Sequence, residues 1–250
     1  MSSLRLPLAL ALCLVAVCIA PAGAAAADAA GYPPAKGPNL RESWTATLIL
    51  GTVARARPDS QARRVKVLRP QTLYSGAPHR FLVLQRKTDD VGQSWVRVRL
   101  PQRPNGLSAW VRADYLRLTR NPWRIVVDRS DRQIRVYRNN RLRLRSNVVV
   151  GAPQWPTPVG IFAIYDVFRP REWPRPAFTG NWVMALTAHS SVLERYGGGP
   201  GVTALHGRGG ASLSDPLGSA RSHGCVRIPN NVMDWLVRRT EPGTPVIIRA

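Results

Sequence analysis

The segment SHGCVR at residues 222–227 carries the most informative pattern in this 250-residue chain, and the segment ALHGR at residues 204–208 belongs with it. Fifteen residues separate His206 from Ser222. A cysteine attacks a substrate as the thiolate, and a free thiol is mostly protonated at neutral pH. Such a thiol needs a base or a positive environment. The two segments therefore predict that Cys225 is a nucleophile and that His206 is its base.

Neighbouring residues of the same segment can assist this chemistry. His223 lies two residues before Cys225, and residues two apart in an extended chain point to the same side. It either polarises the pocket or holds the loop by a hydrogen bond. Gly224 lets the backbone approach a substrate closely, and the amides of Gly224 and Cys225 are the expected donors to an oxyanion. Arg227 either binds a substrate carboxylate beside the thiol or is one more arginine of a basic chain.

The ligand count disfavours a metal site. A zinc site commonly has three or four Cys, His or carboxylate ligands. Only Cys225, His206 and His223 cluster in the sequence, and no acidic residue lies between Asp215 and Asp234. Neither a metal nor another cofactor is expected.

Two more histidines are assigned no catalytic role. His79 is expected at the surface of the N-terminal half of the chain. His189 lies in a loop-like stretch, and a base must come within hydrogen-bond distance of its nucleophile. We therefore expect the base to be His206 and not His189.

Four segments together resemble the signature of the L,D-transpeptidase catalytic domain, also called the YkuD domain. That signature has a His-Gly pair, a gap of about fifteen residues, and then [S/T]-H-G-C with an Asn or Arg two residues after the Cys. The segments TPVG at 157–160 and GTPV at 243–246 resemble other parts of the same domain. The resemblance covers residues 122–250, roughly half of the chain. The fold that it implies is a β-sandwich-like catalytic domain.

The resemblance also implies roles for individual residues. His206 would take the proton from Cys225, and the main-chain carbonyl of Gly207 would hold the other ring nitrogen of His206. Ser222, Gly224 and Arg227 would lie on the substrate and oxyanion side of the pocket. Carbapenem β-lactams would acylate the cysteine.

The implied reaction is acyl transfer between peptide stems of peptidoglycan. The nucleophile would attack the carbonyl before the terminal D-alanine of a tetrapeptide stem and release D-alanine. An amine of a second stem would then resolve the thioester and form a cross-link. Resolution by water would instead make the protein an L,D-carboxypeptidase. A further alternative is a non-catalytic protein that binds the cell wall.

Residues 43–119 resemble bacterial SH3-like domains. The resemblance rests on GQSWVRV at 92–98, followed by SAWV at 108–111 and DYL at 114–116, where a short 3₁₀ turn is expected. Ala109 stands where that family usually has glycine. Apolar and β-branched runs between turn signals predict strands. These strands are expected over 46–54, 64–68, 81–85, 95–100 and 108–111.

Residues 122–250 are predicted to be mostly strand, so the expected fold is mainly β: an SH3-like barrel, then the catalytic domain with one short helix. The helix is expected over 232–239 with Asn231 as its N-cap. The hairpin between 133–137 and 141–145 should turn its leucines and other aliphatic residues inward. The segment 166–182 is expected to be a long loop, either a cover for the active site or a crossing loop. Further strands are expected over 124–128, 148–150, 160–164, 182–185, 202–205 and 245–248.

Residues 1–27 are expected to be a secretory signal, and residues 28–42 a linker. Arg5 precedes an apolar run of 15 residues, and Ala25–Ala27 fits a cleavage site. A membrane anchor is the alternative, but the run is shorter than the roughly 20 residues that span a bilayer. Cleavage would leave no stable membrane span and would place the protein in the cell envelope. Cys225 would then be the sole cysteine, since the other two lie within the signal.

The charge balance is strongly basic. Lys and Arg number 36 against 14 Asp and Glu, which gives a net charge of +22. Such a field attracts polyanions in general. Export argues against nucleic acid, so the expected partners are peptidoglycan stem peptides and anionic wall polymers.

Overall fold

The computed structural model describes residues 37–39, 42–170 and 178–250. The expected signal, residues 1–27, lies outside the described residues, as does most of the expected linker at 28–42. Among the described residues, no helix has both the length and the apolar character needed to cross a bilayer.

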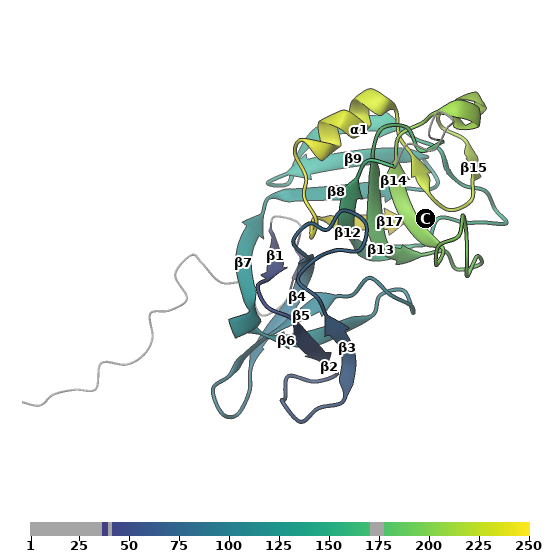
Figure 1. The fold of residues 1–250 in the computed structure, drawn as a ribbon. Helices are drawn as coiled ribbons and strands as arrows, with labels where there is room; N and C mark the ends of the chain where they lie inside the picture. Colours follow the sequence, from purple (N-terminus) through teal and green to yellow (C-terminus); the bar gives the residue numbers. More distant parts are fainter. Residues whose placement is uncertain (1–36, 40–41, 171–177) are drawn as a thin grey trace, which may run out of the picture. The chain divides into compact units, whose positions relative to one another are not determined.

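A seven-stranded antiparallel sheet occupies the N-terminal half, in the order β3-β2-β6-β5-β4-β1-β7 (Figure 1). Its core is built from Trp44, Phe81, Leu100 and the valines of β5 and β6. A 3₁₀ turn, η1 (Ala113–Tyr115), lies where one was expected. The resemblance to SH3-like domains stays a prediction. The strands are β1 (Ser43–Leu48), β2 (Thr52–Arg55), β3 (Arg64–Leu68), β4 (Arg80–Thr88), β5 (Ser94–Arg99), β6 (Ser108–Arg112) and β7 (Leu116–Asn121).

Two features of this sheet differ from the prediction. The single strand expected over 46–54 is two strands, β1 and β2, separated by a turn at 49–51. Ile49 and Leu50 are exposed in that turn although they are apolar, which is why the pattern looked continuous. Strand β7 was not expected, because it is short and polar and its pairing partner, β1, lies far away in the sequence.

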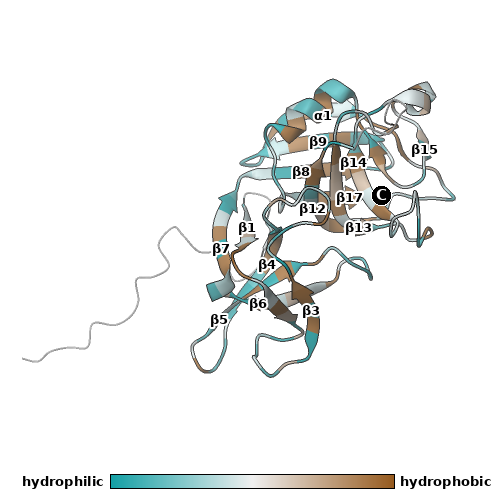
Figure 2. Ribbon diagram, viewed as in Figure 1, coloured by the Kyte–Doolittle hydropathy of each residue, from teal (hydrophilic) through white to brown (hydrophobic). Residues whose placement is uncertain are grey.

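An eight-stranded sheet forms the C-terminal half, in the order β10-β9-β8-β17-β12-β13-β14-β16. Aliphatic side chains fill its core, and hydrophobic residues run along β12 and β14 (Figure 2). Strands β11 (Val150–Gly151) and β15 (Ala220–Ser222) pair separately. The main sheet consists of β8 (Trp123–Asp128), β9 (Gln133–Arg138), β10 (Arg141–Asn147), β12 (Gly160–Phe168), β13 (Val183–His189), β14 (Val202–His206), β16 (Val226–Arg227) and β17 (Pro245–Arg249). Among the described residues, the prediction of a mainly β fold with one short helix is confirmed.

The hairpin between β9 and β10 forms as expected, with Asn139 and Asn140 at positive φ in its turn. Ile134 and Val136 are fully buried, as predicted. Leu142 is 51% exposed, so its expected place in the core was wrong. The register shifts between Leu142 and Leu144, and β10 is the edge strand, so only Leu144 packs against the core.

The α-helix of the described residues, α1, spans Asn230–Val237. Pro229 is its N-cap, and no side chain caps it, so the expected role of Asn231 was wrong. The side chain of Asn230 instead hydrogen-bonds to the segment that follows β14. Its Oδ1 accepts a hydrogen bond from the Arg208 amide at 2.8 Å, and its Nδ2 donates to the Arg208 carbonyl at 2.9 Å.

The two sheets are joined through buried polar contacts, and β4 lies next to β12 (Figure 1). Asp166 of β12 is fully buried. Its carboxylate accepts hydrogen bonds from the amides of Tyr74 and Ser75, both at 3.0 Å, and from the Ser75 hydroxyl at 2.5 Å. Asn121 at the end of β7 donates to Thr244 before β17, at 3.0 Å. The chain passes from β7 to β8 with only Pro122 between them.

Candidate active site

A cavity of about 350 Å³ lies over the end of the C-terminal sheet where β13, β14 and β16 meet. Five of the residues singled out in the sequence line it: Ser222, His223, Cys225, His206 and Arg227. The fold thus brings together segments that are separate in the sequence, because β14 and β16 pair in parallel at 205–206 and 226–227.

Cys225 lies between β15 and β16 and is a free thiol. Its Sγ is 4.0 Å from the carbonyl oxygen of Val202 in β14. Burial raises the pKa of the thiol, while a main-chain hydrogen bond from β14 and the charge of Arg227 oppose that rise. The thiol form therefore predominates at neutral pH.

His206 is the last residue of β14, and its ring is buried. Its Nδ1 is 2.7 Å from the carbonyl oxygen of Gly207. A proton on Nδ1 makes this contact a hydrogen bond and leaves the lone pair on Nε2. Burial lowers the pKa of His206 to about 4; the Gly207 contact opposes this and Arg227 adds to it.

These shifts bear on the charge state of the two residues. The buried site favours a neutral imidazole and a neutral thiol. Within the described chain, no hydrogen bond joins Sγ of Cys225 to the His206 ring.

Gly207 is held by packing as well as by its hydrogen bond. A Cβ at this position would lie 2.4 Å from Oδ1 of Asn230. The side chain of Asn230 thus occupies the space that any larger residue would need. Asn230 was not singled out in the sequence, because an asparagine at a helix start usually indicates a cap.

A turn built on Ser222 presents the cysteine. The Ser222 hydroxyl donates to the carbonyl of Cys225 at 2.5 Å and accepts from the Gly224 amide at 3.1 Å. Gly224 has a φ of 112°, a region that favours glycine. The Gly224 amide is therefore already engaged, whereas the amide of Cys225 donates to no acceptor in the part of the chain that the structure describes.

His223 lies between two aromatic rings. Its ring centroid is 4.2 Å from that of Trp155 and 5.3 Å from that of Tyr196. The Tyr196 hydroxyl is 3.5 Å from Nδ1 of His223. Sequence reasoning missed both aromatics, which stand alone in Pro-rich and Gly-rich stretches.

Arg227 is buried, and its guanidinium forms an ion pair with Asp215. The guanidinium carbon also lies 4.7 Å from the centroid of the Phe178 ring. Asp215 was noted in the sequence only as the nearest acidic residue, and its pairing partner was not foreseen. Its carboxylate offsets the positive charge of the Arg227 guanidinium.

Part of the segment expected to cover the site lies outside the described residues, at 171–177. The first residues of this segment are not a loop as expected, because strand β12 continues to Phe168. Phe168, Pro170 and Phe178 all line the cavity that contains Cys225.

The positions expected for the other two histidines were wrong. His79 is 6% exposed and His189 is 5% exposed. His79 packs on Phe81, and burial lowers its pKa to about 4. His189 is the last residue of strand β13 and not part of a loop. Across the described ranges, no group of three or more His, Cys, Asp or Glu is arranged to hold a metal ion.

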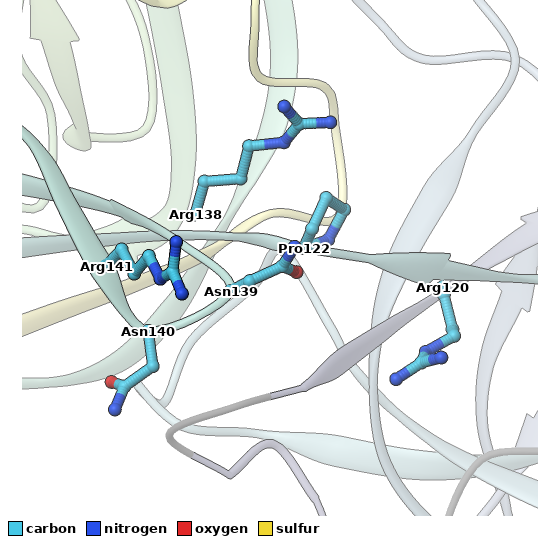
Figure 3. A pocket seen from close by; sticks show the side chains of 6 residues that line it. All are labelled: Arg120, Pro122, Arg138, Asn139, Asn140 and Arg141. Carbon is cyan, nitrogen blue, oxygen red and sulfur yellow. The ribbon is translucent and has the colours of Figure 1, made fainter.

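A second hollow, of about 670 Å³, lies at the turn between β9 and β10 (Figure 3). It is shallow and basic, and it contains no nucleophile or titratable base. Arg120 on its rim is paired with Glu42. The hollow is lined by Arg120, Pro122, Arg138, Asn139, Asn140 and Arg141.

Comparison with protein families gives one match. The model of the L,D-transpeptidase catalytic domain (YkuD) matches residues 122–248. A search of curated proteins found no match.

Solved structures similar to the chain share little sequence with it. An Enterococcus faecium L,D-transpeptidase mutant is 22% identical with a TM-score of 0.36; the match covers 52% of this chain and 50% of that one. The catalytic domain of an E. faecium L,D-transpeptidase is 23% identical with a TM-score of 0.38; the match covers 50% of this chain and 95% of that one. A Mycobacterium smegmatis L,D-transpeptidase is 15% identical with a TM-score of 0.39; the match covers 63% of this chain and 91% of that one. The chain spans about half the length of the first two structures found.

Proposed function

The chain belongs to the L,D-transpeptidase family through its catalytic domain, and from this membership we propose that it cross-links peptidoglycan stems through an acyl-enzyme on Cys225. The observation that carries the proposal is the contact of 2.7 Å between His206 Nδ1 and the Gly207 carbonyl, in the same site as the thiol. That contact leaves Nε2 of His206 free to accept a proton.

The first step is acylation. As Sγ of Cys225 bonds to the carbonyl carbon before the terminal D-alanine, its proton passes to Nε2 of His206. The amide of Cys225 donates to the developing oxyanion, since it has no other acceptor within the described residues. The C–N bond then breaks, and the imidazolium returns its proton to the departing amine of D-alanine.

The second step releases the acyl group. A neutral amine of a second stem attacks the thioester, and His206 removes a proton from the attacking nitrogen. The thiolate leaves and is reprotonated, which restores the neutral pair. Because both resting groups are neutral, proton transfer accompanies attack in each step.

Three residues are proposed to support this chemistry without reacting. Ser222 braces the turn that carries the nucleophile, through its two hydrogen bonds. His223 shapes one wall as part of an aromatic stack. Arg227 orients a substrate carboxylate in competition with Asp215.

The seven-stranded N-terminal sheet is proposed to act as an SH3-like unit that holds the enzyme on the wall. Export through residues 1–27 to the cell envelope is part of the same proposal. The basic surface would add attraction to anionic wall polymers, and this contribution should weaken as salt rises.

Muropeptide analysis after incubation with tetrapeptide-bearing peptidoglycan tests the reaction. Cross-linked product supports the transpeptidase, and trimmed tripeptide without cross-links indicates the L,D-carboxypeptidase alternative. No change, combined with retention on insoluble peptidoglycan, indicates a wall-binding protein. Cys225→Ala should abolish any product, and Lys87→Gln on the exposed end of β4 serves as a matched control.

Carbapenem acylation provides a second test. Intact mass spectrometry should show one adduct, which digestion maps to the peptide containing Cys225. His206→Ala should slow this acylation by about 10²-fold or more. Equal rates for wild type and His206→Ala would remove the proposed base.

A further inference from the structure

Tyr74 belongs to the N-terminal half of the chain, yet it lines the cavity that contains Cys225. It lies in the connection between β3 and β4, at residues 69–79. Its exposed fraction is 39%, so it is accessible to a ligand in that cavity. The proposed acylation and release steps do not use it. Its position relative to the reacting groups decides what it can contact.

The floor of the cavity follows the strand register of the C-terminal sheet. Four residues that line the cavity are cross-strand partners in succession from β12 to β16, namely Phe168, Val183, His206 and Arg227. Cross-strand partners lie on the same face of a sheet. His206 therefore has Arg227 on one side and, beyond Val183, Phe168 on the other.

A second row of residues lies two positions earlier on β12, β14 and β16, and two positions later on β13. Cys225 precedes Arg227 by two residues, and Ala204, Ala185 and Asp166 continue the row as far as β12. Residues two apart in a strand point to the same face, so both rows share one face. The two alanines line the cavity, and their small side chains leave space above the sheet between Cys225 and β12.

Tyr74 is fixed at the β12 end of both rows. Its ring stacks on that of Phe168, with 4.9 Å between the centroids and 29° between the planes. Its amide donates to Oδ2 of Asp166 at 3.0 Å. The ring of Tyr165 meets it edge-on at 6.2 Å between centroids. These contacts hold the side chain in the cavity wall without any substrate.

The strand spacing sets the length of peptide that fits between Cys225 and Tyr74. Three spacings separate β16 from β12, and at about 4.8 Å each they amount to roughly 14 Å. An extended peptide rises about 3.3 Å per residue, so roughly four residues cover this distance. With a substrate carboxylate on Arg227, the end of the donor that carries D-alanine lies on the Arg227 side. The opposite end then crosses β14 and β13 toward Tyr74.

We propose that Tyr74 is a specificity-determining residue for the donor, and that its ring packs against the first residues of the stem, at the end away from D-alanine. A donor that stops short of Tyr74 loses this contact, so the N-terminal half selects donors by their length. An aromatic ring provides a large contact area for such a role. The proposal rests on the proposed transpeptidase function and on the carboxylate role of Arg227.

Donors of two lengths test the contact. They are L-Ala-γ-D-Glu-L-Lys-D-Ala and N-acetyl-L-Lys-D-Ala, and a parallel pair carries meso-diaminopimelate in place of lysine. The wild type should release D-alanine from the long donor with a kcat/KM about tenfold above that for the short donor. Tyr74→Ala, which keeps the amide that bonds to Asp166, should lower kcat/KM for the long donor about tenfold and leave the short donor within about twofold.

Two variants are matched controls. Tyr74→Phe keeps the ring and should keep the preference for the long donor. Leu73 is an exposed neighbour in the same connection and is not among the described residues that line the Cys225 cavity, so Leu73→Ala should leave both donors unchanged. Alkylation of Cys225 by iodoacetamide should proceed at one rate in all these proteins, because the reagent needs no contact with Tyr74.

Four results would overturn the proposal: no length preference in the wild type and, in variants with wild-type thermal stability, an equal loss with both donors, an unchanged preference in Tyr74→Ala, or a preference lost in Tyr74→Phe. If the wild type releases D-alanine from neither donor, the proposed function fails. Equilibrium dialysis of both donors against Cys225→Ala protein, with and without Tyr74→Ala, then decides the contact alone. Tighter binding of the long donor that Tyr74→Ala abolishes supports the contact, and equal or absent binding overturns it.

Discussion

At the scale of single residues, burial more than charge sets the protonation state of the proposed reacting pair. Desolvation disfavours both the thiolate of Cys225 and the imidazolium of His206, so their pKa values move apart. The neutral imidazole of His206, which is the form that the proposed base needs, persists down to about pH 4. In the proposed mechanism, the thiol is then activated when a substrate binds and not at rest.

This neutral pair predicts the pH profile of alkylation. Because the pKa of Cys225 is raised, the rate constant with iodoacetamide should still be rising with pH at about pH 9. Protein unfolded in guanidinium chloride is the control, and its profile should have the midpoint of a free cysteine, about 8.5. A plateau near pH 7 in the folded protein would instead show a thiolate–imidazolium pair.

Asp215 provides a second residue-scale prediction. The charge of Arg227 lowers the pKa of Cys225, and Asp215 offsets that charge. Asp215→Asn should therefore move the alkylation profile to lower pH by roughly 0.5–1 unit, and Arg227→Gln should move it to higher pH. Asp131→Asn, which removes a surface ion pair with Arg135, is the matched control and should leave the profile in place.

At the scale of elements, the start of α1 holds the turn that follows β14. Asn230 bonds to both main-chain groups of Arg208 and fills the space beside Gly207. The carbonyl that contacts His206 is thus placed by a helix more than twenty residues further along the chain. A local motif does not reveal such a partner.

Gly207→Ala tests this arrangement. The added Cβ would collide with Asn230, so we expect a loss of about 1–3 kcal/mol in the free energy of unfolding and a slower acylation of Cys225. Adding Asn230→Ala should restore part of the acylation rate, because it opens the space. Gly51→Ala is the control, since its Cβ meets only ordinary contacts. Acylation at the wild-type rate in Gly207→Ala would mean that the glycine carbonyl does not orient the base.

At the scale of the whole molecule, a buried carboxylate links the described sheets. Asp166 accepts three hydrogen bonds from Tyr74 and Ser75, and Tyr165 accepts another from the Leu73 amide at 3.0 Å. These contacts hold Tyr74, in the connection between β3 and β4, in the wall of the cavity that contains Cys225. A connection of the N-terminal half is therefore part of the wall around Cys225 and His206.

The junction predicts that the two sheets unfold together. Asp166→Ala should lower the free energy of unfolding by about 1–3 kcal/mol, because it removes the buried acceptor of three hydrogen bonds. Guanidinium chloride titration, followed by near-UV and far-UV circular dichroism, should give coincident transitions in the wild type. Asp90→Asn on an exposed turn is the control. Two separated transitions in the wild type would show that the sheets are independent.

The sequence alone determined the family and the mainly β character, and it singled out Cys225 and His206, which line one cavity. It could do so because the HG and SHGC segments have a fixed spacing. Strands can also be predicted locally, because apolar and polar residues alternate along them. The turn at Asn139 and Asn140 could also be predicted from the sequence, because the tolerance of asparagine for positive φ is a local property.

Only the tertiary structure decided the environment of those residues. Burial of His79 and His189, the ion pair of Arg227 with Asp215, and the place of Asn230 all depend on contacts between distant segments. A local sequence pattern does not indicate which polar side chains become buried when a distant segment packs against them. The charge state of the pair follows from the same cause, because desolvation is a property of the whole fold and not of the motif.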